Sequence, residues 1–216
     1  WTGEPGQSPL DPLLYFDFTY ESARLAVEKS SFRPVLGTED AQITVRNQPA
    51  PYEGFTQDQL DDLFLGTIWN SVLGGGAGGN LRWTQPGYGE YNPDGYRGLS
   101  NGMYAAQKAM STILSEMDWG AFYSSYANDS VLPIGNEVDA SVKALSDRNN
   151  MLLMITDRDE DFERRPVRTS LGFRNLRDGR YEVTWFDPRT GETIQKDNAY
   201  GPTFTLRTPA FATFLV

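Results

Sequence analysis

The chain has 216 residues, a formal net charge of −10, and neither cysteine nor histidine. A negative field of this size disfavours nucleic acid, and no basic patch suggests a membrane surface. The two missing residue types exclude disulfides, thiolate and imidazole metal sites, a cysteine nucleophile and a Ser-His-Asp triad. Catalysis would therefore rest on carboxylates, tyrosines, lysines or a bound ion, and no cofactor or metal is expected.

No run approaches the roughly 18–20 apolar residues that span a bilayer. No signal peptide is visible at Trp1, because the start lacks a basic segment followed by an apolar one. Aromatic residues make up 13% of the chain, which also has 21 glycines. Such a composition is compatible with a carbohydrate-handling protein, since neutral sugars are commonly held by ring faces and carboxylates.

The first half of the chain is predicted to alternate strands with helices. The apolar run over residues 13–19 predicts a short buried strand, and residues 20–30 have the apolar spacing of a helix. A second short strand is predicted over residues 33–39. A third spans residues 77–83 and precedes a loop rich in glycine and tyrosine over residues 86–98.

Two further helices have recognisable boundaries. Thr56, followed three residues later by Gln59, is a capping-box signature, and the helix behind it is predicted to end at about Leu73, before three glycines. Ser100 is placed to cap another helix, which ends near Asp118. This alternation predicts parallel β/α construction. Three such units are too few for a closed barrel, which needs eight and about 250 residues.

The second half is predicted to be all β. Asp178-Gly179 suits a two-residue hairpin turn, and residues 187–191 suit a type I turn closed by a glycine bulge. Closely spaced strands with turns between them predict an antiparallel β-sandwich. We place the boundary near residue 128, which gives an α/β domain over 1–128 and an all-β domain over 129–216. The predicted strands cover residues 142–145, 151–155, 167–173, 181–186, 193–195, 203–207 and 210–216.

Glu39 is the first candidate for a catalytic residue. It ends a predicted strand of the β/α array, and the carboxyl ends of barrel strands are where active sites form. A retaining glycosidase needs two carboxylates about 5 Å apart, one of which is the nucleophile. The alternative is a glutamate in a surface loop.

Trp83 ends the next predicted strand and could offer its ring face to a pyranose. The alternative is a tryptophan packed in the core. Further candidates for sugar binding are the neighbours of these two residues, Asp40 and Arg82, and the loop tyrosines Tyr88 and Tyr91. The tyrosine loop would line a sugar cleft or form ordinary surface.

Two other motifs are weaker indications of a binding site. Gly74-x-Gly76-x-x-Gly79 matches the dinucleotide fingerprint literally, but here the helix precedes the strand, and we reject nucleotide binding. Asp157-x-Asp159-x-Asp161 has the spacing of a calcium loop. Phe162 stands where such a loop needs glycine, which favours a solvated hairpin loop over a metal site.

In their order and spacing, these segments resemble the second half of a clan-A (β/α)8 glycoside hydrolase. Residues 33–39 resemble the seventh barrel strand with its nucleophilic glutamate, here Glu39. Residues 68–79 resemble the helix and glycine-rich entry into strand eight, which in that clan leads to the sugar-stacking tryptophan, here Trp83. Residues 181–192 resemble the accessory β-domain of cellulase-like and apiosidase-like enzymes. The resemblance implies a (β/α)8 TIM barrel end followed by that β-sandwich.

The resemblance also implies parts that this chain lacks. The clan's acid/base glutamate follows an asparagine at the end of strand four, whereas Asn136-Glu137 lies after the β/α units here. A missing N-terminal half or a second polypeptide would have to supply it. The competing hypothesis is a non-catalytic carbohydrate-binding or scaffold protein. Enzymes of this kind that act on polysaccharides are more often exported, which favours an extracellular or periplasmic location.

Overall fold

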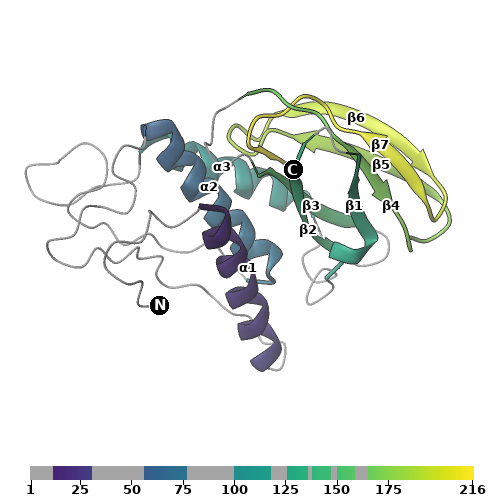
Figure 1. Cartoon of the computed structure of the whole chain (residues 1–216), viewed down its shortest axis with the longest axis horizontal. Coiled ribbons are helices and arrows are strands. Elements are labelled where there is room, and N and C mark those ends of the chain that lie inside the picture. The colour runs from purple at the N-terminus through teal and green to yellow at the C-terminus, as the bar shows by residue number, and fades with distance from the viewer. Residues whose placement is uncertain are drawn as a thin grey trace, which may run out of the picture.

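The computed structural model describes residues 12–30, 56–76, 100–117, 126–135, 138–146, 150–158 and 165–216. In these ranges, three α-helices and a short 3-10 helix, η1 (Asn128–Ser130), precede a group of antiparallel strands (Figure 1). The strands predicted over 33–39 and 77–83, and the loop over 86–98, lie outside the described residues. No described helix is long and apolar enough to cross a membrane.

The strand predicted over residues 13–19 is wrong, because this segment begins helix α1 (Pro12–Lys29). Phe16, Tyr20 and Val27 are all buried, and their spacing places them on one helical face. A short apolar run has no periodicity that separates a strand from a buried helical turn. The predicted helix over 20–30 is confirmed as the rest of α1.

The other two helices begin where their capping residues predict. Helix α2 spans Gln57–Leu73: the Thr56 hydroxyl accepts from the Gln59 amide at 3.3 Å, and the Gln59 side chain accepts from the Thr56 amide at 2.8 Å. Helix α3 spans Asn101–Ser115, and the Ser100 hydroxyl accepts from the Met103 amide at 3.1 Å. Gly75, after the end of α2, has a φ of +90°, a conformation that favours glycine.

Helices α1 and α2 lie side by side and run in the same direction. Early in α1, the Phe16 ring lies against Gly66. One helical turn later, the Tyr20 carbonyl lies beside Gly74, and near the end of α1 the Val27 side chain lies beside Gly75. The two helices therefore make contacts in increasing order along both, which is the signature of parallel packing.

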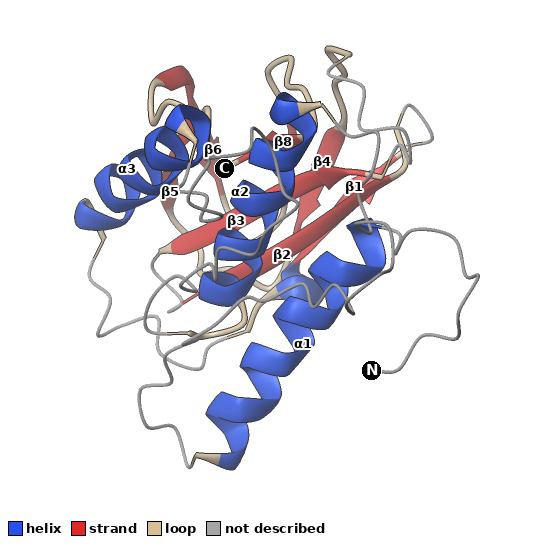
Figure 2. Cartoon of the chain, turned by 90° about the vertical axis from the view of Figure 1, so that its left-hand side faces the viewer, coloured by secondary structure: helices blue, strands red, loops and turns tan. Residues whose placement is uncertain are grey.

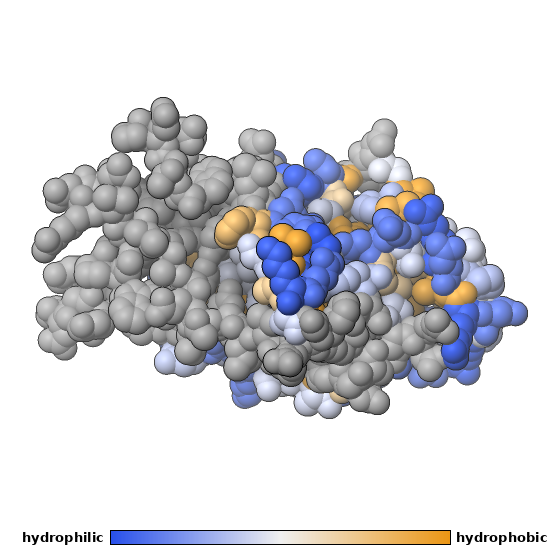
Figure 3. Space-filling model, turned by 90° about the horizontal axis from the view of Figure 1, so that it is seen from below, coloured by the Kyte–Doolittle hydropathy of each residue, from blue (hydrophilic) through white to orange (hydrophobic). Residues whose placement is uncertain are grey.

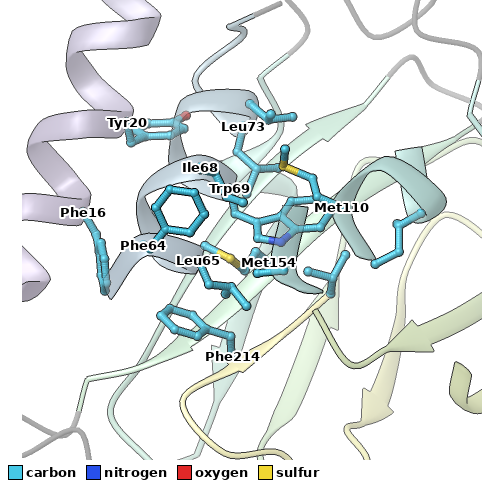
Figure 4. Close-up of a cluster of buried hydrophobic side chains, with 14 of the residues drawn as sticks. Phe16, Tyr20, Phe64, Leu65, Ile68, Trp69, Leu73, Met110, Met154 and Phe214 are labelled. Atoms are coloured by element: carbon cyan, nitrogen blue, oxygen red, sulfur yellow. The ribbon is translucent and has the colours of Figure 1, made fainter. Parts of the chain in front are cut away.

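Helix α3 continues this layer on the other side of α2. The Ser100 hydroxyl donates to Asp61 Oδ1 at 2.5 Å, so the first turns of α3 and α2 are neighbours. Further along both helices, Trp69 and Met110 lie beside each other in the same buried cluster (Figure 4). The three helices thus form one parallel layer in chain order.

The strands form three antiparallel groups. The first has the order β1 (Val131–Ile134), β4 (Ser170–Phe173), β7 (Phe204–Arg207). The second has the order β2 (Ala140–Ser146), β3 (Met151–Asp157), β8 (Phe214–Leu215). The third pairs β5 (Arg180–Phe186) with β6 (Thr193–Tyr200).

Two details of the β region differ from the sequence prediction. Strand β1 was not predicted, since Pro133 lowers the strand signal; proline is tolerated there because β1 lies at a sheet edge. The hairpin at Asp178-Gly179 is wrong, because β4 pairs with β1 and β7 while β5 pairs with β6. The turn over residues 187–191 is confirmed, with Gly191 at a φ of +76°.

The β2–β3–β8 sheet is covered on both of its faces. Along β3, Leu152 and Met154 pack against the helices, whereas Leu153 and Ile155 pack toward the other strands. Figure 2 shows the helices covering one face of the strands. The described residues are therefore a mixed α/β structure with antiparallel sheets, and the predicted parallel barrel strands are not among them. The helix-facing core includes Phe16, Tyr20, Phe64, Ile68, Trp69, Leu73, Met110 and Phe214 (Figure 4).

Candidate functional site

All of the site residues predicted from the sequence lie outside the described residues, and their geometry stays a prediction. Of the possible calcium-loop motif, only Asp157 is described, and it is buried. In the described ranges, no three acidic side chains gather as they would around a metal ion. The predicted site residues are Glu39, Asp40, Arg82, Trp83, Tyr88 and Tyr91.

The first turns of α2 and α3 are the described elements that follow the predicted site segments in the chain. Residues 33–39 precede α2, and residues 77–83 precede α3. Asp61 Oδ1 joins the two helices here, since it accepts from Ser100 Oγ at 2.5 Å and from Gln57 Nε2 at 2.8 Å. The absence of a side chain at Gly102 lets α3 approach the Asp61 carboxylate. The starts of α2 and α3 are therefore held together by one carboxylate.

A second group of polar side chains joins α1 to the β2–β3–β8 sheet. Lys143 Nζ donates to Asp17 Oδ1 at 2.6 Å and lies 4.8 Å from the centre of the Tyr20 ring. Asn128 donates to the Tyr20 hydroxyl at 2.8 Å and accepts from the Ala144 amide at 2.7 Å. The contacts to Asp17 and Tyr20 of α1 link residues more than a hundred positions apart, so no local sequence pattern predicts them.

The cavity beside this group is too small for a sugar. Its volume is about 10 Å³, which is room for one water molecule at most. Asp17 faces it while paired with Lys143, and Arg158 lies 4.0 Å from the same carboxylate. The group is therefore a structural connection between α1 and strands β2 and β3. The cavity is lined by Phe16, Asp17, Asn70, Ser141, Thr156 and Arg158.

The Tyr20 hydroxyl makes the stability contributed by this connection decrease at alkaline pH. Burial raises its pKa above the usual 10.0, although the hydrogen bond from Asn128 acts in the opposite direction. In the unfolded chain Tyr20 ionises first, so its contribution to folding is complete below pH 10.0 and declines as the pH rises through that value. We expect Tyr20→Phe to lose less stability than the parent between about pH 8 and about pH 10.5. Urea unfolding at both pH values measures this, and an equal decline in both proteins would contradict it.

A third polar contact fixes the β5–β6 turn against α2. Arg189 Nε and Nη2 donate to the two oxygens of Asp62 at 2.8 and 2.7 Å, a bidentate geometry, and Arg189 Nη1 donates to the Ala212 carbonyl at 3.0 Å. The Asp62 side chain is 1% exposed and that of Arg189 is 23% exposed. Gly191 of the same turn lies against Ala109 of α3. The turn therefore contacts both α2 and α3.

Comparisons with known proteins give distant likenesses only. No family model and no curated protein matches the chain. A glycoside hydrolase family 5 structure from Bacteroides vulgatus matches with a TM-score of 0.46 and 11% identity, over 91% of this chain and 44% of that one. A structure named glycoside hydrolase matches with a TM-score of 0.44 and 12% identity, over 91% of this chain and 45% of that one.

A glucosidase structure from Croceicoccus marinus matches with a TM-score of 0.40 and 12% identity, over 97% of this chain and 50% of that one. The chain thus spans about half the length of these structures. All three are named as glycosidases. Their TM-scores all lie below 0.5.

Proposed function

We propose that this chain is the C-terminal part of a retaining glycoside hydrolase that cleaves O-glycosidic bonds in an oligo- or polysaccharide. The acid/base carboxylate would come from an N-terminal segment or a partner chain. One observation carries the proposal: α1, α2 and α3 pack as a parallel layer in chain order. Successive β/α units produce this arrangement, because each strand runs back between two parallel helices.

The lengths of the segments support the same construction. Helix α2 has 17 residues and is therefore about 25 Å long. The chain has to return over a comparable distance between the end of one helix and the start of the next. A strand of the predicted length, over residues 33–39 or 77–83, would span about 23 Å.

This construction would bring the predicted site residues together. In a β/α unit the carboxyl end of the strand lies at the end of the layer where the following helix begins. Glu39 would then lie near the start of α2 and Trp83 near the start of α3. The Asp61–Ser100 hydrogen bond holds those two helix starts side by side, which supports a shared site at this end of the layer.

The chemistry would follow the two-step retaining mechanism. Glu39 would attack the anomeric carbon while the second carboxylic acid protonates the departing glycosidic oxygen, giving a glycosyl ester of Glu39. Water, deprotonated by the second carboxylate, would then cleave that ester. Trp83 would stack on the sugar, and Asp40, Arg82, Tyr88 and Tyr91 would bind its hydroxyls.

A mechanism-based label tests the proposal. The complete enzyme should be incubated with 2-deoxy-2-fluoroglycosides of several sugars, each with an activated leaving group. These compounds slow the second step and trap the glycosyl ester. We expect a mass increase of one fluorosugar, located in the peptide that contains Glu39. Hydrolysis with a label on another carboxylate would refute the role of Glu39. Binding of oligosaccharides without hydrolysis or label would favour the non-catalytic hypothesis.

A further inference from the structure

One face of the β5–β6 pair presents an exposed aromatic ring among polar side chains. Tyr200 is 67% exposed, the largest exposed fraction among the large hydrophobic side chains described. The register pairs Tyr200 with Arg180, and the next row on the same face pairs Asn198 with Glu182. Lys196 continues this face along β6, and all five side chains belong to exposed residues. We call these five residues the Tyr200 face.

The guanidinium group of Arg180 is held across the two strands. Its Nε and Nη2 donate to Asn198 Oδ1 at 3.2 and 2.9 Å, and Nη2 lies 3.3 Å from Glu182 Oε1. Among the described residues, no acceptor is bonded to Arg180 Nη1, Asn198 Nδ2 or Lys196 Nζ. The Tyr200 face therefore combines an accessible ring with polar hydrogens that a ligand can use.

Charge is distributed unevenly along the chain. Residues 165–216 carry eight arginines and lysines against five acidic residues, a net charge of +3, whereas the whole chain has a net charge of −10. Arg180 and Lys196 bring two of these positive charges to the Tyr200 face, and Glu182 offsets one of them. The face therefore has a small positive charge on a protein that is negative elsewhere, which favours a ligand with few negative charges.

The chemistry of the Tyr200 face identifies a class of ligand. The C–H side of a sugar ring packs on an aromatic side chain, guanidinium and ammonium groups bind carboxylates, and amide hydrogens bind hydroxyls. Tyr200 and Lys196 are four residues apart on one strand, or about 13 Å, which is long enough for several linked sugars. We propose that the Tyr200 face binds a polysaccharide that carries occasional carboxylates among neutral sugars. This inference rests on the proposed function for its choice of a carbohydrate.

Other macromolecules fit this face less well. Ile194, the other exposed apolar side chain on the face, is six residues from Tyr200 and so about 20 Å away, which leaves no continuous apolar patch for a protein. Seen from below, the end of the molecule that contains the strands is largely hydrophilic, with hydrophobic residues scattered over it (Figure 3). A nucleic acid carries a phosphate on every unit, and the Glu182 side chain, which is 80% exposed, would repel it.

Binding to immobilised polysaccharides tests the proposal. The probes are glucuronoxylan, xanthan and gum arabic, each in its native form and in a carboxyl-reduced form, and the 216-residue chain is the analyte in biolayer interferometry. We expect binding to at least one native probe, and affinity about tenfold lower for its carboxyl-reduced form. The carboxylate-dependent part should decrease as salt increases, because exposed charges are screened.

Three variants locate the bound polysaccharide. Tyr200→Ala should lower the affinity for both forms of the probe at least about tenfold, because the stacking surface is lost. Lys196→Gln should lower the affinity for the native form alone, since its contribution is to the carboxylate. Tyr104→Ala is the matched control: Tyr104 lies on α3 and is 58% exposed, and its removal should leave binding unchanged. Thermal unfolding checks that all three variants are folded.

Four results would overturn the inference. They are no binding to any native probe, equal binding of native and carboxyl-reduced forms, unchanged binding by folded Tyr200→Ala, and tighter Tyr200-dependent binding of single-stranded oligo(dT) than of any polysaccharide. Hydrolysis is measured separately on the complete enzyme. Tyr200-dependent binding without hydrolysis would refute the proposed activity and leave this binding face standing, and hydrolysis without such binding would do the reverse.

Discussion

Glu39→Gln is expected to abolish hydrolysis by the complete enzyme while leaving its fold and sugar affinity nearly unchanged. Glutamine has the size and hydrogen-bonding reach of glutamate, but its neutral amide does not displace a glycosidic oxygen at the anomeric carbon. Loss of an attacking group in a hydrolase can lower turnover by roughly 10⁴–10⁶-fold. Initial rates with an aryl glycoside and with the natural oligosaccharide measure the loss.

Glu192→Gln provides the control for this substitution. Glu192 is exposed in the β5–β6 turn region, so the same chemical change there should leave the rates unaltered. Thermal unfolding of both variants should match the parent, which separates a catalytic effect from a folding defect. Turnover by Glu39→Gln within a factor of about ten of the parent would exclude Glu39 as the nucleophile.

The second large effect is expected at the buried ion pair between α2 and the β5–β6 turn. Arg189→Ala would leave the carboxylate of Asp62 without its cation at a position that is 1% exposed. Breaking a buried pair in this way typically costs about 3–5 kcal/mol in the free energy of unfolding. Asp62→Asn should cost less, because Arg189 is 23% exposed and its guanidinium can turn to water.

Urea unfolding of the two single variants and of the double variant measures both the losses and their coupling. We expect the double variant to be nearly as stable as Asp62→Asn, since the two changes remove one shared interaction. Arg180→Ala is the surface control: its pair with Glu182 is exposed, and a loss of about 0–1 kcal/mol is expected. Losses at Arg189 as small as those at Arg180 would show that the buried pair is not a stabilising link.

The comparison of sequence with structure separates local from long-range determinants. The starts of α2 and α3 were predicted correctly because Thr56, Gln59 and Ser100 act on amides within three residues of themselves. The turn before Gly191 was predicted for the same reason. The strand predicted over residues 13–19 is wrong because a segment of seven residues has too little periodicity to choose between strand and helix. The buried partners Gly66 and Phe214, which contact Phe16 and decide that choice, come from distant segments.

The sequence by itself determined the chemistry that is possible here and the positions where helices begin. It carries no histidine or cysteine, and its candidate nucleophile and sugar-stacking residue, Glu39 and Trp83, were chosen from local pattern and resemblance. The tertiary structure alone decided the parallel order of the three helices, the two-sided burial of the β2–β3–β8 sheet and the pairing of Asp62 with Arg189. The physical reason is the distance along the chain over which each kind of interaction acts. Caps and turns satisfy backbone groups a few residues away, whereas packing and ion pairs depend on side chains that meet only after the chain has folded.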